Sequence, residues 1–228
     1  MLERRAPWVK RATSSVLDLL AALAPCVRCG TRPARADGCC TPCASRGWRA
    51  HRDGDVLSLG GYRDGVGDVV RAAKFGGAMR LLDLVGAALG DGLLDAAPVD
   101  ASGAPPWLVP VPSHPRRRAA RGDDPSLRIA RAMAIRADAG GRRFEVVQAL
   151  TRRVVTAPQS TLPSARREAN VEGAFVVAPH FHARLATRSV VLVDDVLTSG
   201  ATARAAAAAV RDAGAVVCLV AVAAVAGA

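Results

Sequence analysis

The stretch VVLVDDVLTSGATA, residues 190–203, decides the fold, because it joins an apolar run to two adjacent acids and a small-residue turn. A run of Val and Leu is typical of a parallel strand that is buried on both faces. Burying one carboxylate is unfavourable and burying two neighbours is worse, so Asp194 and Asp195 are expected at the strand's carboxyl end, away from the core. We therefore predict a strand over 189–193 and a helix over 200–213.

The residues after this strand have the chemistry of a sugar-phosphate site. In an open parallel sheet, ligands bind beyond the carboxyl ends of the strands, where two acids can accept hydrogen bonds from the paired hydroxyls of a ribose. The N-terminus of a helix binds phosphate, and Gly200 lets the backbone come close to it. Thr198, Ser199 and Thr202 add hydroxyl donors. The stretch predicts a ribose 5-phosphate site; the alternative is an ordinary strand–turn–helix whose Thr or Ser only caps the helix.

Strand and helix patterns alternate along most of the chain, which indicates an α/β fold with a doubly wound, mostly parallel sheet. The residues between 151 and 170 are polar and rich in Arg, without apolar periodicity. The predicted strands are 56–62, 107–112, 144–150, 173–178 and 215–225, and the further predicted helices are 14–23, 65–75, 78–94 and 125–138.

The 228 residues carry a formal net charge of +11, nearly all from Arg, since the chain has two lysines, Lys10 and Lys74. Such a balance favours anionic partners: phosphorylated small molecules, nucleic acid or an acidic membrane surface. The longest uncharged stretch, 213–228, is shorter than the roughly 20 apolar residues of a spanning helix, so no membrane span is expected. Asp18 interrupts the first apolar stretch, which favours an amphipathic helix in a cytoplasmic protein over a signal peptide.

Cysteines gather in CVRCGTRPARADGCCTPC, residues 26–43, as two Cys-x-x-Cys pairs. Four thiolates at this spacing fit a tetrahedral, structural zinc ion, and a cytosolic chain favours metal over disulfides. Cys39 competes with Cys40 as a ligand, and the two-residue gap favours Cys40. The alternative is a ribbon that no longer binds metal, and Cys218, in the last predicted strand, is expected to be a buried hydrophobe. The predicted zinc ligands are Cys26, Cys29, Cys40 and Cys43.

The stretch 190–203 resembles the phosphoribosyl pyrophosphate (PRPP) signature of type I phosphoribosyltransferases: four apolar residues, two acids, then Thr/Ser–Gly–x–Thr. The resemblance implies that Asp194 and Asp195 are the catalytic pair and bind the ribose hydroxyls, that 198–202 bind the 5-phosphate, and that Mg²⁺ accompanies PRPP. The residues implied in PRPP binding here are Val196, Leu197, Thr198, Ser199, Gly200, Ala201 and Thr202.

The whole chain resembles the ComF family (ComFC- or GntX-like proteins). The motifs that carry this resemblance, in order, are LDLLAALAPCVRCG (17–30), YRDGVGDVVRAAKFGG (62–77), LVPVPSHPRRRAARG (108–122) and LTRRVVTAPQSTLPSARREANVEGAF (150–175). The resemblance implies an N-terminal helix and a four-cysteine zinc ribbon over 1–50 and a phosphoribosyltransferase-like domain of the type I kind over 51–228. One departure matters: the family continues Arg-Gly with Phe-Asn-Gln, whereas this chain has Asp123, Asp124 and Pro125, so any stacking or amide contact from that place is expected to be lost.

Further residues, most of them basic, are candidates to bind phosphates or nucleic acid. The loop after VPVP lies where phosphoribosyltransferases bind pyrophosphate, and Arg can bind phosphate bidentately; the alternative is a solvated basic turn. Lys74 is either a phosphate contact or a snorkelling surface residue. Residues 151–170 have the composition of a mobile hood over the site, or of a basic flexible loop. The candidates are Ser113, Arg116, Arg117, Arg118 and Lys74 for phosphate, and Arg152, Arg153, Gln159, Arg166, Arg167 and Asn170 in the hood.

Two functions from different classes follow. The first is a PRPP-binding phosphoribosyltransferase, in which an acceptor nitrogen attacks C1 of the ribose. The second, implied by the association of the ComF family with competence, is handling of single-stranded DNA during uptake, with a helicase-like partner. Single-strand binders usually offer aromatic rings beside their positive charge, and this chain has few. A PRPP-sensing protein without catalysis is a third possibility.

Overall fold

The computed structural model describes residues 48–63, 65–96, 103–153 and 173–226. These belong to the second of the two units into which the chain divides, residues 48–228. The predicted zinc ribbon with its four cysteine ligands, and the alternative ligand Cys39, lie outside the described residues. So do four residues of the predicted hood, Gln159, Arg166, Arg167 and Asn170.

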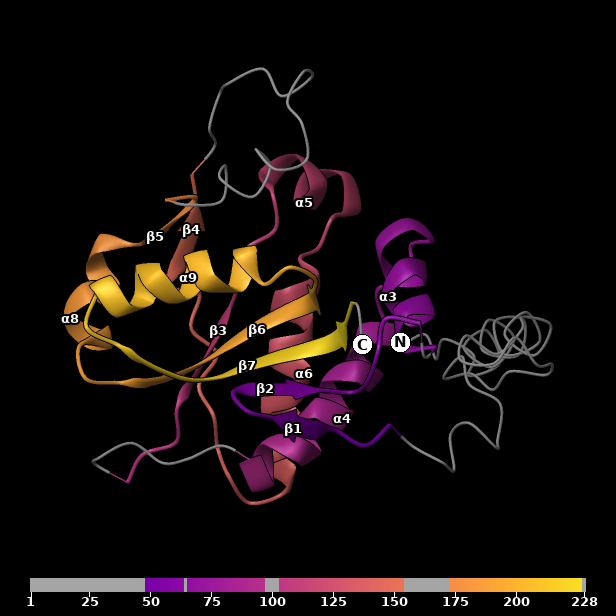
Figure 1. The fold of residues 1–228 in the computed structure, drawn as a ribbon, viewed down its shortest axis with the longest axis horizontal. Coiled ribbons are helices and arrows are strands. Elements are labelled where there is room, and N and C mark those ends of the chain that lie inside the picture. Colours follow the sequence, from indigo (N-terminus) through magenta and orange to yellow (C-terminus); the bar gives the residue numbers. More distant parts are fainter. Residues whose placement is uncertain (1–47, 64, 97–102, 154–172, 227–228) are drawn as a thin grey trace, which may run out of the picture. The chain divides into compact units, whose positions relative to one another are not determined.

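The described unit is an α/β fold with a mostly parallel five-stranded sheet, as the sequence predicts (Figure 1). The strand order is β1-β2-β7-β6-β3, and only β1 runs antiparallel to its neighbour. Strands β4 and β5 form a separate antiparallel pair. The sheet strands are β1 (His51–Asp53), β2 (Val56–Ser58), β3 (Trp107–Pro110), β6 (Ser189–Leu197) and β7 (Val216–Val225); the pair is β4 (Leu150–Arg152) and β5 (Phe175–Val177).

Helices cover both faces of this sheet (Figure 1). Side chains alternate between the two faces of the sheet along β6. Val190 and Leu192 pack in a hydrophobic cluster with the buried residues of α9, whereas Val191 and Val193 are buried on the opposite face of the sheet, near α6. Burial on both faces explains why this strand is an unbroken apolar run. The helices are α3 (Val66–Phe75), α4 (Leu81–Ala96), α5 (Pro115–Arg121), α6 (Pro125–Ala139), α8 (His182–Leu185) and α9 (Ala201–Asp212).

Strand β6 is longer than predicted. It continues past Val193 to Leu197, because β7 is long enough to pair with it there: Asp194 lies opposite Val222 and Leu197 opposite Val225. The acid pair therefore lies within the last part of a hydrogen-bonded strand rather than beyond its end.

The predicted strand over 144–150 is largely wrong. Leu108 on β3 makes two backbone hydrogen bonds to this segment, to Glu145 and Val147, and one isolated bridge, to Val146. The next residue of β3 that would face the segment is Pro110, which has no N–H to donate, so the ladder ends there. The chain then leaves the sheet and forms β4.

Besides β4, four short elements were not predicted. Two of them are β1, which is joined to β2 by a two-residue turn containing Gly54 (φ 55°), and α5, which begins with Pro115 and is followed by Gly122 (φ 73°). Pro at a helix start and Gly just past its end are sequence signals that could have found α5. The other two are the 3₁₀ turn Pro179–Phe181 and α8, into which it leads.

Candidate functional site

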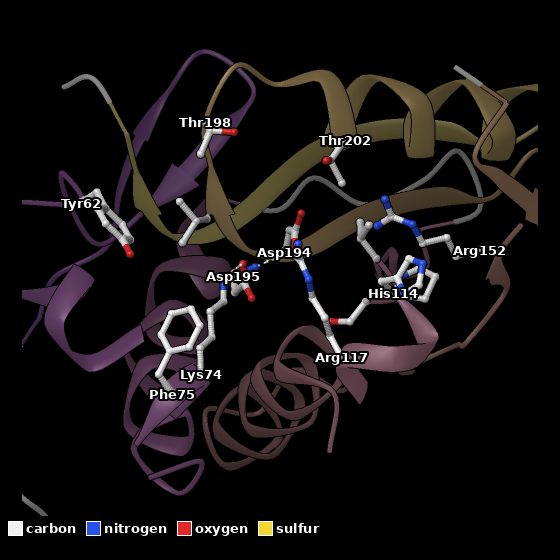
Figure 2. A pocket seen from close by; sticks show the side chains of 14 residues that line it. Tyr62, Lys74, Phe75, His114, Arg117, Arg152, Asp194, Asp195, Thr198 and Thr202 are labelled. Atoms are coloured by element: carbon white, nitrogen blue, oxygen red, sulfur yellow. Dashed lines mark hydrogen bonds and ion pairs between the residues drawn. The ribbon is translucent and has the colours of Figure 1, made fainter. Parts of the chain in front are cut away.

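A pocket of about 490 Å³ lies at the carboxyl ends of β3 and β6 (Figure 2). This is the edge of a parallel sheet where ligands are expected to bind. The acids of β6 lie between an aromatic side, with Tyr62 and Phe75, and a basic side, with Arg117 and Arg152 (Figure 2). The lining residues are Tyr62, Lys74, Phe75, Val111, Pro112, Ser113, His114, Arg117, Arg152, Asp194, Asp195, Val196, Thr198 and Thr202.

Asp194 is held by hydrogen bonds, and Asp195 by an ion pair. Oδ1 of Asp194 accepts hydrogen bonds from Oγ of Ser126 (3.0 Å) and from the backbone N–H of Asp195 (2.8 Å). Among the described residues, both hydrogen bonds to this carboxylate use Oδ1, so Oδ2 is the oxygen that can accept from a ligand. Oδ1 of Asp195 lies 2.7 Å from Nζ of Lys74, which comes from the last turn of α3.

The acids are more buried than the sequence suggests: the side chain of Asp195 is 13% exposed and Asp194 is half-buried. Burial and the neighbouring charge of Asp195 raise the pKa of Asp194 to about 7, although the N–H of Asp195, the hydroxyl of Ser126 and the charge of Lys74 act in the opposite direction. At neutral pH this carboxyl is therefore divided between its protonated and ionised forms.

The turn after β6 leads directly into α9. Gly200 precedes the helix with φ 77°, a conformation that favours glycine, and a Cβ at this position would lie 2.8 Å from Nη1 of Arg204. That nitrogen donates to the carbonyl of Ser199 (2.9 Å), so Arg204 braces the turn from outside. Of the predicted PRPP-binding residues here, Val196, Thr198 and Thr202 line the pocket; Leu197 pairs with β7, and Ser199, Gly200 and Ala201 form the turn and the helix start.

The basic side of the pocket is formed by three residues that we call the basic wall: His114 and Arg117 from the loop and helix after β3, and Arg152 from β4. Burial, with the positive charges of Arg152, Arg116 and Arg117, lowers the pKa of His114, which favours a neutral imidazole. Its Nδ1 accepts from the N–H of Arg116 (3.3 Å), which leaves Nε2 to carry the proton. The candidate Arg116 is exposed and is not among the lining residues.

Ser113, a predicted phosphate contact, lines the pocket, but both of its hydrogen-bond donors bind Asp124. Its N–H donates to Oδ2 (3.0 Å) and its Oγ to Oδ1 (3.1 Å). The sequence comparison predicts that the segment Asp123–Pro125 has lost a stacking or amide contact. In the structure, the same segment makes a different and specific contact, through Asp124, with the loop after β3.

Several lining residues were missed by the sequence reasoning. Phe75 follows Lys74 and is 79% exposed although it is a large apolar residue, and Tyr62 lies on the same side of the pocket, with Cζ of Arg71 5.0 Å from its ring centre. Both belong to the motif 62–77, so their place in that motif was the available signal. Ser126 does not line the pocket, but it holds Asp194 by a hydrogen bond. No sequence pattern around Ser126 indicates this contact, because it depends on where α6 begins relative to β6.

Among the described residues, no three His, Cys, Asp or Glu side chains lie close enough together to hold a metal ion. Within the same ranges, no helix is both long and apolar enough to cross a membrane. Neither a scan against protein-family models nor a search of curated proteins found a match for this chain.

Proposed function

We propose that the described unit binds a 5-phosphoribosyl group, as PRPP with Mg²⁺, in a phosphoribosyltransferase-like domain of the type I, doubly wound kind. The observation that carries the proposal is the convergence of three features on one pocket. An acid pair, a turn that opens a helix and a basic wall meet at the carboxyl edge of a parallel sheet. A ribose with a phosphate at one end and a diphosphate at the other has matching groups for all three.

The acid pair suits the ribose hydroxyls. Oδ2 of Asp194 and the carboxylate of Asp195 are acceptors, and two neighbouring hydroxyls are donors. The ammonium of Lys74 balances the charge of Asp195 and holds its side chain in place. The ionised form of Asp194 is the better acceptor, so ribose binding favours loss of its proton.

The two phosphate-bearing ends of the ligand would meet different parts of the pocket. The N-terminus of α9, a helix of 12 residues, and the hydroxyls of Thr198 and Thr202 suit the 5-phosphate. Arg117 and Arg152 suit the diphosphate, with His114 as a neutral donor through Nε2. Mg²⁺ usually keeps several waters and binds phosphate oxygens, so it would neutralise the charge of the diphosphate beside this wall.

Such a site is suited to transfer of the phosphoribosyl group. The bond between C1 and the diphosphate oxygen breaks, the diphosphate leaves with the electron pair, and an acceptor nitrogen forms the new bond to C1 and then loses a proton. The chain's own contribution is to hold the ribose in a fixed orientation and to stabilise the charge that develops on the leaving group.

Calorimetric titration tests the proposal with wild-type protein, with Asp194→Asn/Asp195→Asn and with the matched control Asp212→Asn, which removes a carboxylate at the far end of α9. PRPP with Mg²⁺ should bind wild type and the control with similar affinity, and the double variant should lose saturable binding while keeping its fold by circular dichroism. Absence of binding to folded wild type, or equal binding by the double variant, contradicts the proposal.

A second candidate is binding of single-stranded nucleic acid, as the competence association suggests. The supporting observation is that Arg116, Arg117 and Arg118, consecutive on α5, are exposed beside the pocket. Against it, Trp107, Phe144 and Phe175 are buried, and Phe75 is the one largely exposed Phe, Trp or Tyr ring among the described residues, whereas single-strand binders usually stack several bases on exposed rings. Affinity for an oligonucleotide should fall by roughly 0.7 log units per log unit of salt for each phosphate contact if this candidate holds. A flat salt dependence contradicts it.

A further inference from the structure

Asp124 is a buried carboxylate whose side-chain hydrogen bonds go to the loop after β3 rather than to its own helix. It immediately precedes α6 with an extended backbone (φ −108°, ψ 115°), the position from which an Asp usually caps a helix, yet its side chain makes no capping hydrogen bond. It is 6% exposed. Instead, its two oxygens accept one hydrogen bond each from the N–H and Oγ of Ser113. A carboxylate is retained at such a depth only where specific hydrogen bonds offset its lost hydration.

The loop 112–114 is therefore held in place by the hydrogen bonds between Ser113 and Asp124, at the start of α6. Because both donors of Ser113 are used by Asp124, Ser113 has no hydrogen left to give to a phosphate. It acts instead as the point at which the loop is attached to α6. The next residues along the chain, His114 and Arg117, carry the basic wall into the pocket. Their position relative to the acid pair depends on where this attachment holds the loop.

Asp124 is itself anchored. Its N–H donates to Oδ1 of Asp123 (2.8 Å), and the other oxygen of Asp123 lies 3.1 Å from Nη1 of Arg128. Arg128 also binds both oxygens of Asp83 on α4 (2.8 and 2.7 Å). A continuous series of hydrogen bonds thus connects α4, the start of α6 and the loop 112–114, while Ser126, in the first turn of α6, holds Asp194.

We propose that Asp124 is a positioning residue: by fixing Ser113 it sets the distance between the basic wall and the acid pair, and so gives the pocket its preference for PRPP over ribose 5-phosphate. This inference rests on the proposed function. The two ligands share the ribose hydroxyls and the 5-phosphate and differ in the diphosphate, which is the group that only the basic wall meets. Disturbing Asp124 therefore affects PRPP and spares ribose 5-phosphate.

The test compares the dissociation constants of PRPP with Mg²⁺ and of ribose 5-phosphate for wild type, Asp124→Ala, Asp124→Asn and the control Asp138→Ala. Asp138 carries the same charge but is exposed in the last turn of α6, outside the series of hydrogen bonds that holds the loop 112–114. Asp124→Ala should weaken PRPP binding about tenfold and ribose 5-phosphate binding by less than about twofold. Asp124→Asn, which keeps one acceptor oxygen for Ser113, should fall between wild type and Asp124→Ala, and Asp138→Ala should keep the PRPP preference.

Two further measurements separate positioning from general damage. Amide hydrogen exchange, measured without ligand, should accelerate at Ser113 in Asp124→Ala and not in Asp138→Ala. Ser113→Ala combined with Asp124→Ala should weaken PRPP binding no more than Asp124→Ala alone, because the two residues act as one unit. An unchanged PRPP preference in Asp124→Ala, or an equal loss for both ligands, overturns the inference and leaves the proposed function standing. A folded wild type that binds neither ligand overturns both.

Discussion

Replacing Ser126 by Ala should make ribose 5-phosphate binding depend more steeply on pH. Ser126 is 1% exposed, and its hydroxyl donates to Asp194, whose pKa is about 7; this hydrogen bond is one of the influences that lower that pKa. A hydrogen bond to a charged group contributes about 1.5–3 kcal/mol, and one pKa unit corresponds to about 1.4 kcal/mol, so the pKa should rise by about one unit at the lower end of this range. At pH 7 the ionised fraction would then fall from about one half to about one tenth.

If the ionised carboxylate binds the ribose, affinity for ribose 5-phosphate at pH 7 should fall about fivefold in Ser126→Ala and recover by about pH 9. The assay is calorimetric titration between about pH 5.5 and 9 on both proteins, so that titration of the ligand's own phosphate cancels in the comparison. Ser189→Ala, which removes a buried hydroxyl at the distant start of β6, is the matched control. A loss that is equal at every pH would show that Ser126 matters for packing alone and would refute the reasoning.

The same pKa predicts how stability varies with pH: because the native state holds the Asp194 proton more tightly than the unfolded chain, this group contributes its full stability only below its ordinary pKa of 3.8, and that contribution is lost progressively as the pH rises from there to about 7. Asp194→Asn should therefore raise the melting temperature most at pH 8, less at pH 5 and little near about pH 3, measured by thermal denaturation. Gly67→Ala should destabilise the unit by about 1–3 kcal/mol and weaken ribose 5-phosphate binding, because a Cβ there would collide with the carbonyl of Tyr62, a pocket residue; unchanged denaturant midpoint and affinity would contradict this. Zinc analysis of the purified chain should find about one ion per chain, lost in Cys40→Ser and retained in Cys39→Ser; loss in both, or in neither, would count against the predicted ligand set.

The parts of the fold that the sequence predicts well are those with a long apolar period. β6, β7, α4, α6 and α9 each match their predicted ranges to within a few residues, because burial of a whole face leaves a regular pattern. The weak places are short elements with two or three paired residues. β1 is exposed throughout, so it has no apolar pattern, and β4 begins after Pro110 has ended the ladder beside β3.

In the candidate site, too, residues that are neighbours in the sequence could be predicted, and residues that are brought together only by packing could not. Asp194 and Thr198 line the pocket together and could be predicted to do so, because they are neighbours in one stretch of sequence. Ser126 and Asp124 could not, since they reach the site only through the packing of α6 against the sheet, which no local pattern encodes. The sequence offers Lys74 as either a phosphate contact or a snorkelling surface residue, whereas in the described structure it donates to the carboxylate of Asp195, 121 residues away along the chain.

Arg152 enters the pocket from β4, and no ladder joins the β4–β5 pair to the five-stranded sheet in the described part of the chain. The acid pair, by contrast, belongs to a strand that is fixed in register against β7 on both sides of the acids, with Val193 opposite Ala221 and Val196 opposite Ala224. A mutation in the β4–β5 pair can therefore move one arginine without disturbing the acids. Over evolutionary time, this arrangement lets selection change the arginine side of the pocket while the half that carries the acid pair stays the same, so divergence among related chains should concentrate on the β4–β5 side.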